Sequence, residues 1–546
     1  MSPIFTEARK SDWPLLLGLA LASGVLFFYR LGVPGLMDPD EGRYAEIARE
    51  MLVLKDWLVP HLNYVPYLEK PPLVYWLTAL SFKIFGYTEW AARLPAALAA
   101  AGGVGLAYGL GRTFWGPGPA FWGAMILATA AGYVALGRLL ILDMPLSFFL
   151  NLGIALGYLA LSRGRRELFP WAYLALALGV LVKGPVALAL PALIWGAWII
   201  LTRQASGRDL LHWPALLLLA AVTLPWFLAA AWRVPEFTRF FLVEQHLGRF
   251  LTPAIHGGQP WYFYGPVLMA LMLPWSFLLP WALARKFPRN DPDRLFLWLW
   301  AGVVLVFFSL SRGKLIPYIL PGLLPLALLL GEALDGVART GFRWRDNWVL
   351  TFILALWALA AAGAAALYYW PPAFLAERLA PGAFLAPFPG LGLAILALIP
   401  LTALGFRNLG VLGGVVLVSA LIPLGMDRVS EVRSPRPAGQ ALRAEWQPGA
   451  ALVGVKLYSQ GLSFYSGQPA YLVGLKGELD FGFRVAPEKG FFLAGPRGLE
   501  KLAQAHRPLF LYLKSRDRSR LEGWLPGDYQ LLARYKDCIL LRYERK

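Results

Sequence analysis

The chain has 546 residues, of which 58% are apolar and only 15% are charged. Soluble proteins carry about 25% charged residues, and apolar runs near twenty residues are long enough to cross a bilayer. The composition therefore excludes a soluble globular protein and predicts a polytopic membrane protein. The formal net charge of +18 does not indicate a nucleic-acid partner, because the Lys and Arg of membrane proteins gather in cytoplasmic loops.

The first apolar segment, residues 13–29, follows Arg9 and Lys10. It lacks a small-residue cleavage site, so we expect it to be retained as the first helix. Cys538 is the single cysteine of the sequence, which excludes an intrachain disulfide and a zinc site built from several cysteines.

The densest set of charges follows that segment, in residues 38–50. Asp38 and Pro39 are typical of an N-cap and a first helical position, and Glu41 falls where a capping box places a carboxylate. Asp40 would then lie in the first turn, where the helix dipole favours a negative charge. The same pattern is also typical of a plain capped helix at a membrane surface.

Apolar residues of this stretch recur at helical spacing. One helix face can therefore lie on apolar surface, while Arg43, Glu46 and Glu50 face elsewhere. The sequence predicts an amphipathic helix within the first outer loop, residues 31–72.

Breaks at charged or Pro/Gly-rich stretches predict about thirteen spans. Their approximate centres are residues 22, 102, 126, 153, 176, 193, 222, 272, 302, 327, 358, 396 and 417. With the N-terminus in the cytoplasm, the inner connections carry most of the Lys and Arg, whereas the first outer loop is acidic. An odd number of spans places the C-terminus on the outer side.

A second domain is predicted after residue 426. Residues 1–426 would form the transmembrane catalytic domain, and residues 427–546 a small α/β domain on the periplasmic side. Four short apolar runs predict strands there, with a helix at 498–506; the strands are expected at 451–455, 491–494, 509–513 and 538–543. Residues 461–467 are interpreted as a turn and not as a phosphate loop. We see no nucleophile–base pair in this domain and expect it to cover or orient the membrane site.

The predicted topology gathers charged and aromatic residues on the outer side of the membrane. They are Asp40, Glu41, Arg43, Glu69, Lys70, Arg138, Asp143, Lys183, Glu244, His246, Arg249, His256, residues 261–264, Lys314 and Tyr318. Each has a structural alternative, such as a helix cap for Asp143 or a snorkelling side chain for Lys314. Because charges at membrane depth are costly, their convergence favours a site for a phosphate carried on a lipid.

Several motifs, taken in order, resemble one family of membrane enzymes. They are residues 40–51, 56–60, 67–76, 142–145, 244–250, 260–263 and 314–321. They resemble lipid-linked-sugar glycosyltransferases with the GT-C membrane fold, bacterial relatives of dolichyl-phosphate-mannose–protein mannosyltransferase. The nearest likeness is to the 4-amino-4-deoxy-L-arabinose (aminoarabinose) transferases that modify lipid A. The resemblance covers residues 10–330 well, and the C-terminal domain is similar in placement alone.

The resemblance implies an undecaprenyl-phosphate sugar donor, an envelope glycolipid or protein as acceptor, and a place in the bacterial inner membrane. It implies catalytic carboxylates at Asp40, Glu41 and Asp143. It also implies donor or lipid-phosphate contacts, which are Arg43, Tyr44, Lys70, Arg249, Lys314 and Tyr318. In the aminoarabinose enzymes a divalent metal, here expected to be zinc, is associated with a glutamate and a histidine, which implicates Glu69 with His256 or His246.

The expected reaction is an inverting displacement on the periplasmic side. The acceptor oxygen would attack the anomeric carbon, with Asp40 as general base or as a positioning group for an anionic acceptor. A double displacement through a carboxylate nucleophile remains an alternative. Two further alternatives are a protein O-mannosyltransferase and, in another class, a flippase for lipid-linked sugars. We find none of the internal repeats that many transporters show, which argues against the flippase. The sequence also lacks the Trp-Trp-Asp signature of oligosaccharyltransferases, which argues against that class.

Overall fold

The computed structural model describes residues 12–248, 258–285, 291–339 and 421–545, except 476, 488–490, 494 and 536. The chain divides into two compact units. Unit 1 comprises Met1–Leu31, Ala96–Pro225 and Glu244–Met426, and unit 2 comprises Gly32–Pro95, Trp226–Val243 and Asp427–Lys546. One boundary falls at the predicted residue 426. The first outer loop, however, belongs to the unit that holds the C-terminal segment.

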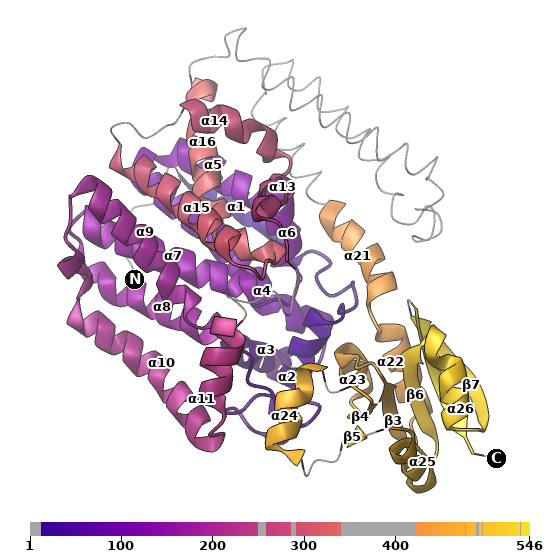
Figure 1. Ribbon diagram of the computed structural model, residues 1–546. Coiled ribbons are helices and arrows are strands. Elements are labelled where there is room, and N and C mark those ends of the chain that lie inside the picture. Colours follow the sequence, from indigo (N-terminus) through magenta and orange to yellow (C-terminus); the bar gives the residue numbers. More distant parts are fainter. Residues whose placement is uncertain are drawn as a thin grey trace, which may run out of the picture. The chain divides into compact units, whose positions relative to one another are not determined.

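Unit 1 is built of helices (Figure 1). In chain order they are α1 (Trp13–Ser23), the π-helix η2 (Gly24–Phe28), α4 (Glu89–Trp115), α5 (Pro117–Thr129), α6 (Ala131–Gly137), α7 (Asp143–Ser162), η3 (Arg166–Leu168), α8 (Phe169–Lys183), α9 (Val186–Thr202), η4 (Gly207–Leu210), α10 (Trp213–Arg233), η5 (Phe240–Gly248), η6 (Trp261–Phe263), α13 (Tyr264–Leu271), η7 (Trp275–Leu278), α14 (Leu279–Arg285), α15 (Pro292–Leu310), η8 (Ile316–Gly322) and α16 (Leu323–Arg339). Helices α4, α10 and η5 also contribute residues to unit 2.

Five helices among the described residues are long and apolar enough to cross a membrane, or up to seven if each bent pair counts as one span. The chain is therefore a helical membrane protein. The three predicted spans centred at residues 358, 396 and 417 lie outside the described residues. The count of thirteen therefore stays a prediction.

Two predicted spans are broken instead of straight. Helices α5 and α6 meet at 63°, and the segment Trp261–Leu271 meets Trp275–Ala284 at 111°. The two breaks contact each other, because the Ala131 backbone N–H donates to the Leu273 carbonyl at 2.8 Å. The Trp275 indole N–H also donates to the Thr129 hydroxyl at 2.9 Å. Each break thus supplies hydrogen bonds to the other, as broken helices in a bilayer require.

Helix α5 packs along α16 through small residues. A Cβ added at Gly331 would lie 2.3 Å from the backbone nitrogen of Gly123, so the two backbones approach too closely for any side chain there. Small residues are the usual means of close helix packing in membranes, where apolar side chains gain little by leaving lipid.

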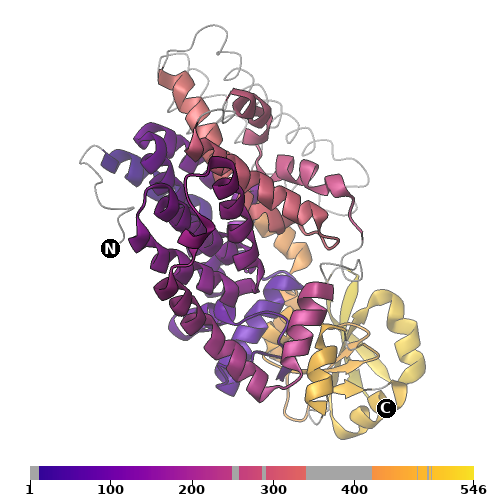
Figure 2. The same ribbon diagram turned by 60° about the vertical axis from the view of Figure 1, so that its left-hand side comes forward.

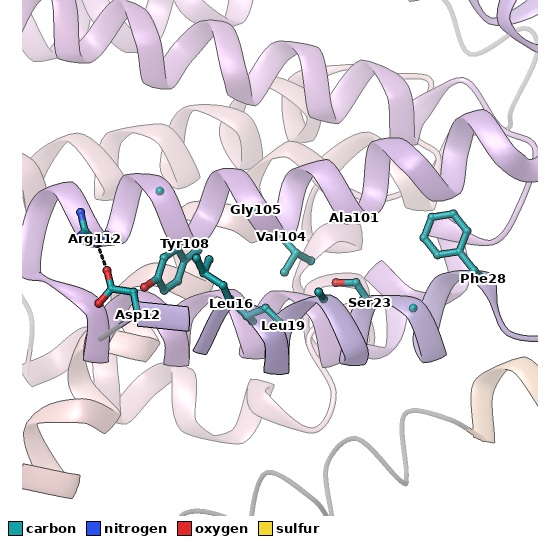
Figure 3. Close-up of a pocket in the computed structure, with 13 residues that line it drawn as sticks. Asp12, Leu16, Leu19, Ser23, Phe28, Ala101, Val104, Gly105, Tyr108 and Arg112 are labelled. Carbon is teal, nitrogen blue, oxygen red and sulfur yellow. Dashed lines mark hydrogen bonds and ion pairs between the residues drawn. The ribbon is translucent and has the colours of Figure 1, made fainter. Parts of the chain in front are cut away.

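Helices α1 and α4 enclose a largely apolar cavity of about 400 Å³ (Figure 3). Leu19 of α1 and Val104 of α4 are among its lining residues. The Arg112 guanidinium pairs with the Asp12 carboxylate at one end, at 2.7 Å. This pair lies near the C-terminal end of α4.

Unit 2 combines helices from the first outer loop with a mixed sheet from the C-terminal segment. Its elements are α2 (Asp40–Leu54), β1 (His61–Leu62), β2 (Val65–Pro66), α3 (Leu73–Phe85), α11 (Phe237–Arg239), α21 (Leu421–Arg433, which begins in unit 1), α22 (Arg436–Glu445), β3 (Ala451–Val455), α23 (Gln460–Ser466), β4 (Ala470–Val473), η9 (Gly477–Leu479), α24 (Asp480–Val485), β5 (Phe492–Leu493), α25 (Pro496–Ala505), β6 (Leu509–Lys514), η11 (Ser515–Asp517), α26 (Arg518–Trp524), β7 (Asp528–Tyr535) and β8 (Cys538–Glu544).

The six-stranded sheet has the order β5-β4-β3-β6-β8-β7. Strands β5, β4, β3 and β6 run parallel, and β8 and β7 are antiparallel to their neighbours. Because side chains alternate across a strand, Val453, Leu511 and Leu541 share one face, where α25 and α26 supply Leu499 and Leu521. On the other face Trp446, just after α22, stacks on Phe510. Figures 1 and 2 show these strands side by side between helices.

The C-terminal segment contains both helices and strands, and it differs from the prediction in two respects. Strands β4 and β7 were not predicted; β7 is largely exposed and lacks a continuous apolar pattern. Residues 461–467 were predicted to be a turn, which is wrong, because they lie in α23 and its C-cap. The Ser459 hydroxyl caps that helix by accepting from the Leu462 N–H, and Gly467 ends it at φ 74°.

Candidate functional site

Helix α2 presents two carboxylates at its N-terminus, Asp40 and Glu41 in the first turn. The helix dipole favours negative charge there. The predicted N-cap is wrong, because Pro39 occupies that position and no side chain caps the helix. The Asp38 carboxylate instead accepts hydrogen bonds from the Ser459 hydroxyl at 2.5 Å and from the Gly461 backbone N–H at 2.9 Å. The start of α2 is thereby fixed to α23.

Glu41 is buried and doubly paired. The Arg93 guanidinium donates to its two oxygens at 2.7 and 2.8 Å, and the Met37 backbone N–H donates to Oε2 at 3.0 Å. Arg93 is itself 0% exposed and also donates to the carbonyls of Pro34 and Gly35. These contacts favour a structural role for Glu41, which holds the segment before α2 against α4.

Asp40 has the opposite surroundings, since 58% of its side chain is exposed. The Arg43 guanidinium lies 3.4 Å from one Asp40 oxygen and 2.8 Å from Glu478 Oε2. Only 16% of the Arg43 side chain is exposed, so this cation is committed to two carboxylates. Asp40 therefore combines access to solvent with a fixed position, as a general base requires.

Glu478 was not predicted as a site residue. It lies in η9, 438 positions after Asp40, in a segment that we expected only to cover the site. Burial raises the pKa of its carboxyl, Glu69 and Asp40 add to the rise, and Arg43 opposes it. No local sequence signal marks Glu478, because its partner is distant along the chain.

Two tyrosines and Glu69 complete this region of unit 2. Tyr67 and Tyr75 are buried, and Glu69 is 9% exposed. Burial raises the pKa of the Tyr67 hydroxyl well above its ordinary value, and the charge of Glu69 raises it further. Both hydroxyls therefore stay protonated at neutral pH. Lys70 is partly buried beside Glu69, and Tyr44 packs against Tyr75 with ring centroids 5.9 Å apart.

The sequence predicted that the remaining charges of α2 face away from its apolar side. In the structure these side chains are buried. Glu46 and Glu50 are fully buried. Arg49 donates to both oxygens of Glu46 at 2.7 Å, and the Tyr64 backbone N–H donates to Glu50 at 2.9 Å. Burial raises the pKa of the Glu50 carboxyl, and the neighbouring Glu46 raises it further. The reason for the difference is that α23 packs against α2.

In unit 1 the structure pairs Asp143 with Lys183. The ammonium lies 2.5 Å from a carboxylate oxygen, and both side chains are largely buried. The same ammonium lies 4.4 Å from the centroid of the Tyr318 ring, a cation–π contact. The predicted site residues Asp143 and Tyr318 are therefore brought together through Lys183.

Lys314 is 6% exposed and donates to two backbone carbonyls, Ser311 at 2.6 Å and Gln259 at 3.2 Å. It is thus buried and held in place, whereas a snorkelling side chain would extend into solvent. Arg138 is also buried and donates to the carbonyls of Leu26 and Tyr29, so it satisfies the end of the first span.

Three predicted site residues remain to be located in the structure. Arg249 and His256 lie outside the described residues, as does the side chain of His246. Within the described part of the chain, no three His, Cys, Asp or Glu side chains gather in a way that could hold a metal ion.

Comparison with known families gives two matches. Residues 13–241 match the family described as dolichyl-phosphate-mannose-protein mannosyltransferase, and residues 438–494 match the aminoarabinose transferase C-terminal domain. A Pseudomonas aeruginosa (strain UCBPP-PA14) protein named undecaprenyl phosphate-alpha-4-amino-4-deoxy-L-arabinose arabinosyl transferase is 40% identical over 370 residues, which are 65% of each chain. The match thus spans just under two thirds of the length of this curated relative.

Solved structures extend the likeness to almost the whole chain. The crystal structure of ArnT from Cupriavidus metallidurans bound to undecaprenyl phosphate has a TM-score of 0.84 at 26% identity and covers 98% of both chains. An oligosaccharyltransferase, AglB from Archaeoglobus fulgidus, has a TM-score of 0.51 at 12% identity over 98% of this chain and 74% of its own. The second likeness concerns the fold alone.

The helical bundle and these likenesses define a class, that of helical membrane proteins with the GT-C glycosyltransferase fold. AglB shares that fold without close sequence similarity. Within the class, the chain is similar to the aminoarabinose transferases, through the identity to the Pseudomonas aeruginosa relative, the match of residues 438–494 and the likeness to the Cupriavidus metallidurans structure.

Proposed function

We propose that this protein transfers a sugar of the aminoarabinose class from undecaprenyl phosphate to a cell-envelope glycolipid such as lipid A. The observation that carries the proposal is the likeness over 98% of both chains to a relative bound to undecaprenyl phosphate. The name of the Pseudomonas aeruginosa relative supplies the sugar. The C-terminal match to the aminoarabinose transferases supports the same sugar class.

The chemistry that unit 2 supports is a single displacement. The acceptor oxygen forms a bond to the anomeric carbon as the bond from that carbon to the phosphate oxygen breaks. The electron pair leaves with undecaprenyl phosphate, and the configuration inverts. If the acceptor is a hydroxyl, its proton goes to Asp40; if it is already anionic, Asp40 only positions it.

Charge on the departing phosphate requires a cation, because the lipid-linked phosphate leaves in a region of low dielectric. Arg43 is engaged by Asp40 and Glu478. We assign the phosphate contact in unit 2 to Lys70, a cation for which the resemblance implies this role. The contacts of Lys314, Tyr318 and Arg249 with lipid phosphate stay predictions.

The proposed setting is the bacterial inner membrane. About thirteen spans, with the N-terminus in the cytoplasm, place the catalytic carboxylates and residues 427–546 in the periplasm. The proposal is supported by the bias of Lys and Arg toward the connections predicted to be internal.

The metal site that the resemblance implied stays a prediction, because the side chains of His246 and His256 lie outside the described residues. Glu69, the described residue of that site, lies near Glu478 and Tyr67. No step of the proposed reaction is therefore assigned to a metal.

A protein O-mannosyltransferase is the second candidate, favoured by the match of residues 13–241 to the mannosyltransferase family. The acceptor distinguishes the two. Membranes containing the protein are incubated with radiolabelled undecaprenyl-phosphate sugars and envelope extract, and the labelled product is separated. We expect label in the glycolipid fraction. Label in protein would favour the second candidate, and label in neither would contradict a transferase.

A further inference from the structure

Unit 2 contains a group of polar side chains that we name the Arg43 cluster. Its members come from α2, from the loop before α3, from α3 and from η9, and they are Asp40, Arg43, Tyr67, Glu69, Tyr75 and Glu478. Direct contacts join Arg43 to Asp40 at 3.4 Å and to Glu478 at 2.8 Å. The tyrosine hydroxyls interact electrostatically with Arg43, Glu69 and Glu478.

The cluster has an excess of acidic groups. It brings together three carboxylates, those of Asp40, Glu69 and Glu478, and one guanidinium. Adding Lys70, next to Glu69 in the sequence, gives two cations against three carboxylates. The three carboxylates of the cluster suit a bound cation.

The cluster also contains a buried hydroxyl, that of Tyr75. The Tyr75 side chain is 0% exposed, and among the described residues its hydroxyl has no hydrogen-bond partner. A buried hydroxyl without a partner costs about 1–3 kcal/mol, so such groups are rare in native proteins unless a ligand or water completes them. This atom lies among the charges of Arg43, Glu69 and Glu478.

The outer side of the cluster is accessible. The Asp40 side chain is 58% exposed and that of Glu478 is 21% exposed, whereas Tyr67 and Tyr75 are buried. Asp40 and Glu478 are therefore the members of the cluster that a ligand from solvent would meet first. An ammonium has three donors and no acceptor, which matches carboxylate oxygens and a hydroxyl.

We propose that the Arg43 cluster binds the protonated amine of the donor sugar, and that Glu478 is the carboxylate that determines specificity for an aminosugar over a neutral sugar. The inference rests on the proposed function, because it names the part of the protein that recognises the sugar of the same donor. It gives the C-terminal segment a direct role in donor selection.

The electrostatics of the free protein agree with this role. Burial, Glu69 and Asp40 all raise the pKa of the Glu478 carboxyl, and only part of that effect is offset by Arg43. An ammonium bound beside Glu478 would favour its charged form and lower its pKa.

The test uses the purified full-length protein and two synthetic donors. One donor is undecaprenyl phosphate-4-amino-4-deoxy-arabinose, and the other is undecaprenyl phosphate-arabinose, which carries a hydroxyl in place of the amine. Both binding and transfer to lipid A are measured for the wild type, Glu478→Gln and Glu478→Asp. Asp480→Asn is the matched control, since it removes a carboxylate two positions away that pairs with Arg484 on the surface. Undecaprenyl phosphate alone reports whether the lipid site is intact.

We expect the wild type and Asp480→Asn to bind the aminosugar donor about ten- to hundred-fold more tightly than the neutral donor, the range expected for a charge-assisted hydrogen bond. Glu478→Gln should lose that preference while its affinity for undecaprenyl phosphate is unchanged, and Glu478→Asp should keep part of it. Equal loss for both donors in Glu478→Gln, or an unchanged preference, would overturn the inference. If the wild type transfers the neutral sugar and the aminosugar with equal efficiency, the inference is overturned but the proposed transferase function is not. A wild type that binds undecaprenyl phosphate but transfers neither sugar contradicts the proposed function instead.

Discussion

Asp40 and Glu41 are neighbours in one turn of α2, but only one of them is available for chemistry. Glu41 is buried with both oxygens engaged, whereas Asp40 is mostly exposed and pairs with Arg43. The sequence placed both in a candidate catalytic set. It could not separate them, because the Arg93 partner of Glu41 lies 52 positions away, on α4.

Glu41→Gln should destabilise the protein by about 3–5 kcal/mol, because it removes the carboxylate that pairs with the buried Arg93 guanidinium. The measurement is thermal or denaturant unfolding of the detergent-purified protein. The matched control is Glu167→Gln, whose partner Arg165 is exposed, and its unfolding should be unchanged. Equal stability of Glu41→Gln and the wild type would return Glu41 to the list of candidate catalytic residues.

Glu50 provides a test of pH dependence. Its carboxyl faces Glu46, Arg49, the Tyr64 backbone N–H and Tyr458, and burial followed by Glu46 raises its pKa. The folded protein therefore keeps this proton over a pH range in which the unfolded chain has lost it. The resulting stabilisation is fully present below the ordinary glutamate pKa, about 4.3, and is lost as the pH rises through the raised value.

Glu50→Gln removes this titration, so its unfolding temperature should fall less than that of the wild type as the pH rises from 5 toward 8, values that bracket the physiological range. Unfolding of the two proteins is followed in parallel over that range. Glu522→Gln, which changes a surface pair with Arg518, should follow the wild type. Parallel curves for Glu50→Gln and the wild type would show that Glu50 has no raised pKa.

At the scale of elements, α2 was predicted from its own sequence, whereas its environment was not. Helical periodicity identified the helix and the acidic first turn, which the structure contains. Periodicity placed Glu46 and Glu50 away from the apolar face of the helix, but it could not show that both are buried or that α23 packs against α2. A contact between segments separated by more than 400 residues leaves no trace in a local apolar pattern.

The broken spans show the same limit. Apolar length predicted continuous spans around residues 126 and 272, but each bends sharply where it contacts the other. A Cβ added at Gly132 would lie 2.7 Å from the Leu271 Cα and 2.1 Å from its Cδ2. Glycine at 132 therefore permits the close approach of α6 and α13.

Gly132→Ala should lower stability by about 1–3 kcal/mol, because the added methyl forces these two helices apart. Gly302→Ala, in α15, is the matched control, since nothing lies within 4 Å of its added Cβ. There alanine should leave stability unchanged or raise it, as it does in open helix positions. The unfolding of both variants is compared with that of the wild type. If Gly132→Ala is as stable as the wild type, the α6–α13 contact is not tight.

At the scale of the whole molecule, the sequence identified a membrane protein and the change of character near residue 426. It treated the C-terminal segment as a separate cover for the site. The structure instead joins this segment to the first outer loop in one unit, through Asp38–Ser459 and Arg43–Glu478. Composition could mark the boundary because polarity changes there, but it could not reveal which earlier segment completes the fold. In each of these contacts, one of the two residues lies in a stretch of sequence that carries no motif.

The central claim is that an exposed carboxylate at the start of α2 promotes sugar transfer from undecaprenyl phosphate. The most direct measurement is transfer from defined undecaprenyl phosphate-4-amino-4-deoxy-arabinose to lipid A in liposomes, with the wild type and Asp40→Asn at matched folding and matched affinity for undecaprenyl phosphate. The account predicts turnover by the wild type and a loss of about 10²–10⁴-fold in Asp40→Asn, the range for removal of a general base. Turnover by Asp40→Asn near the wild-type rate would contradict it.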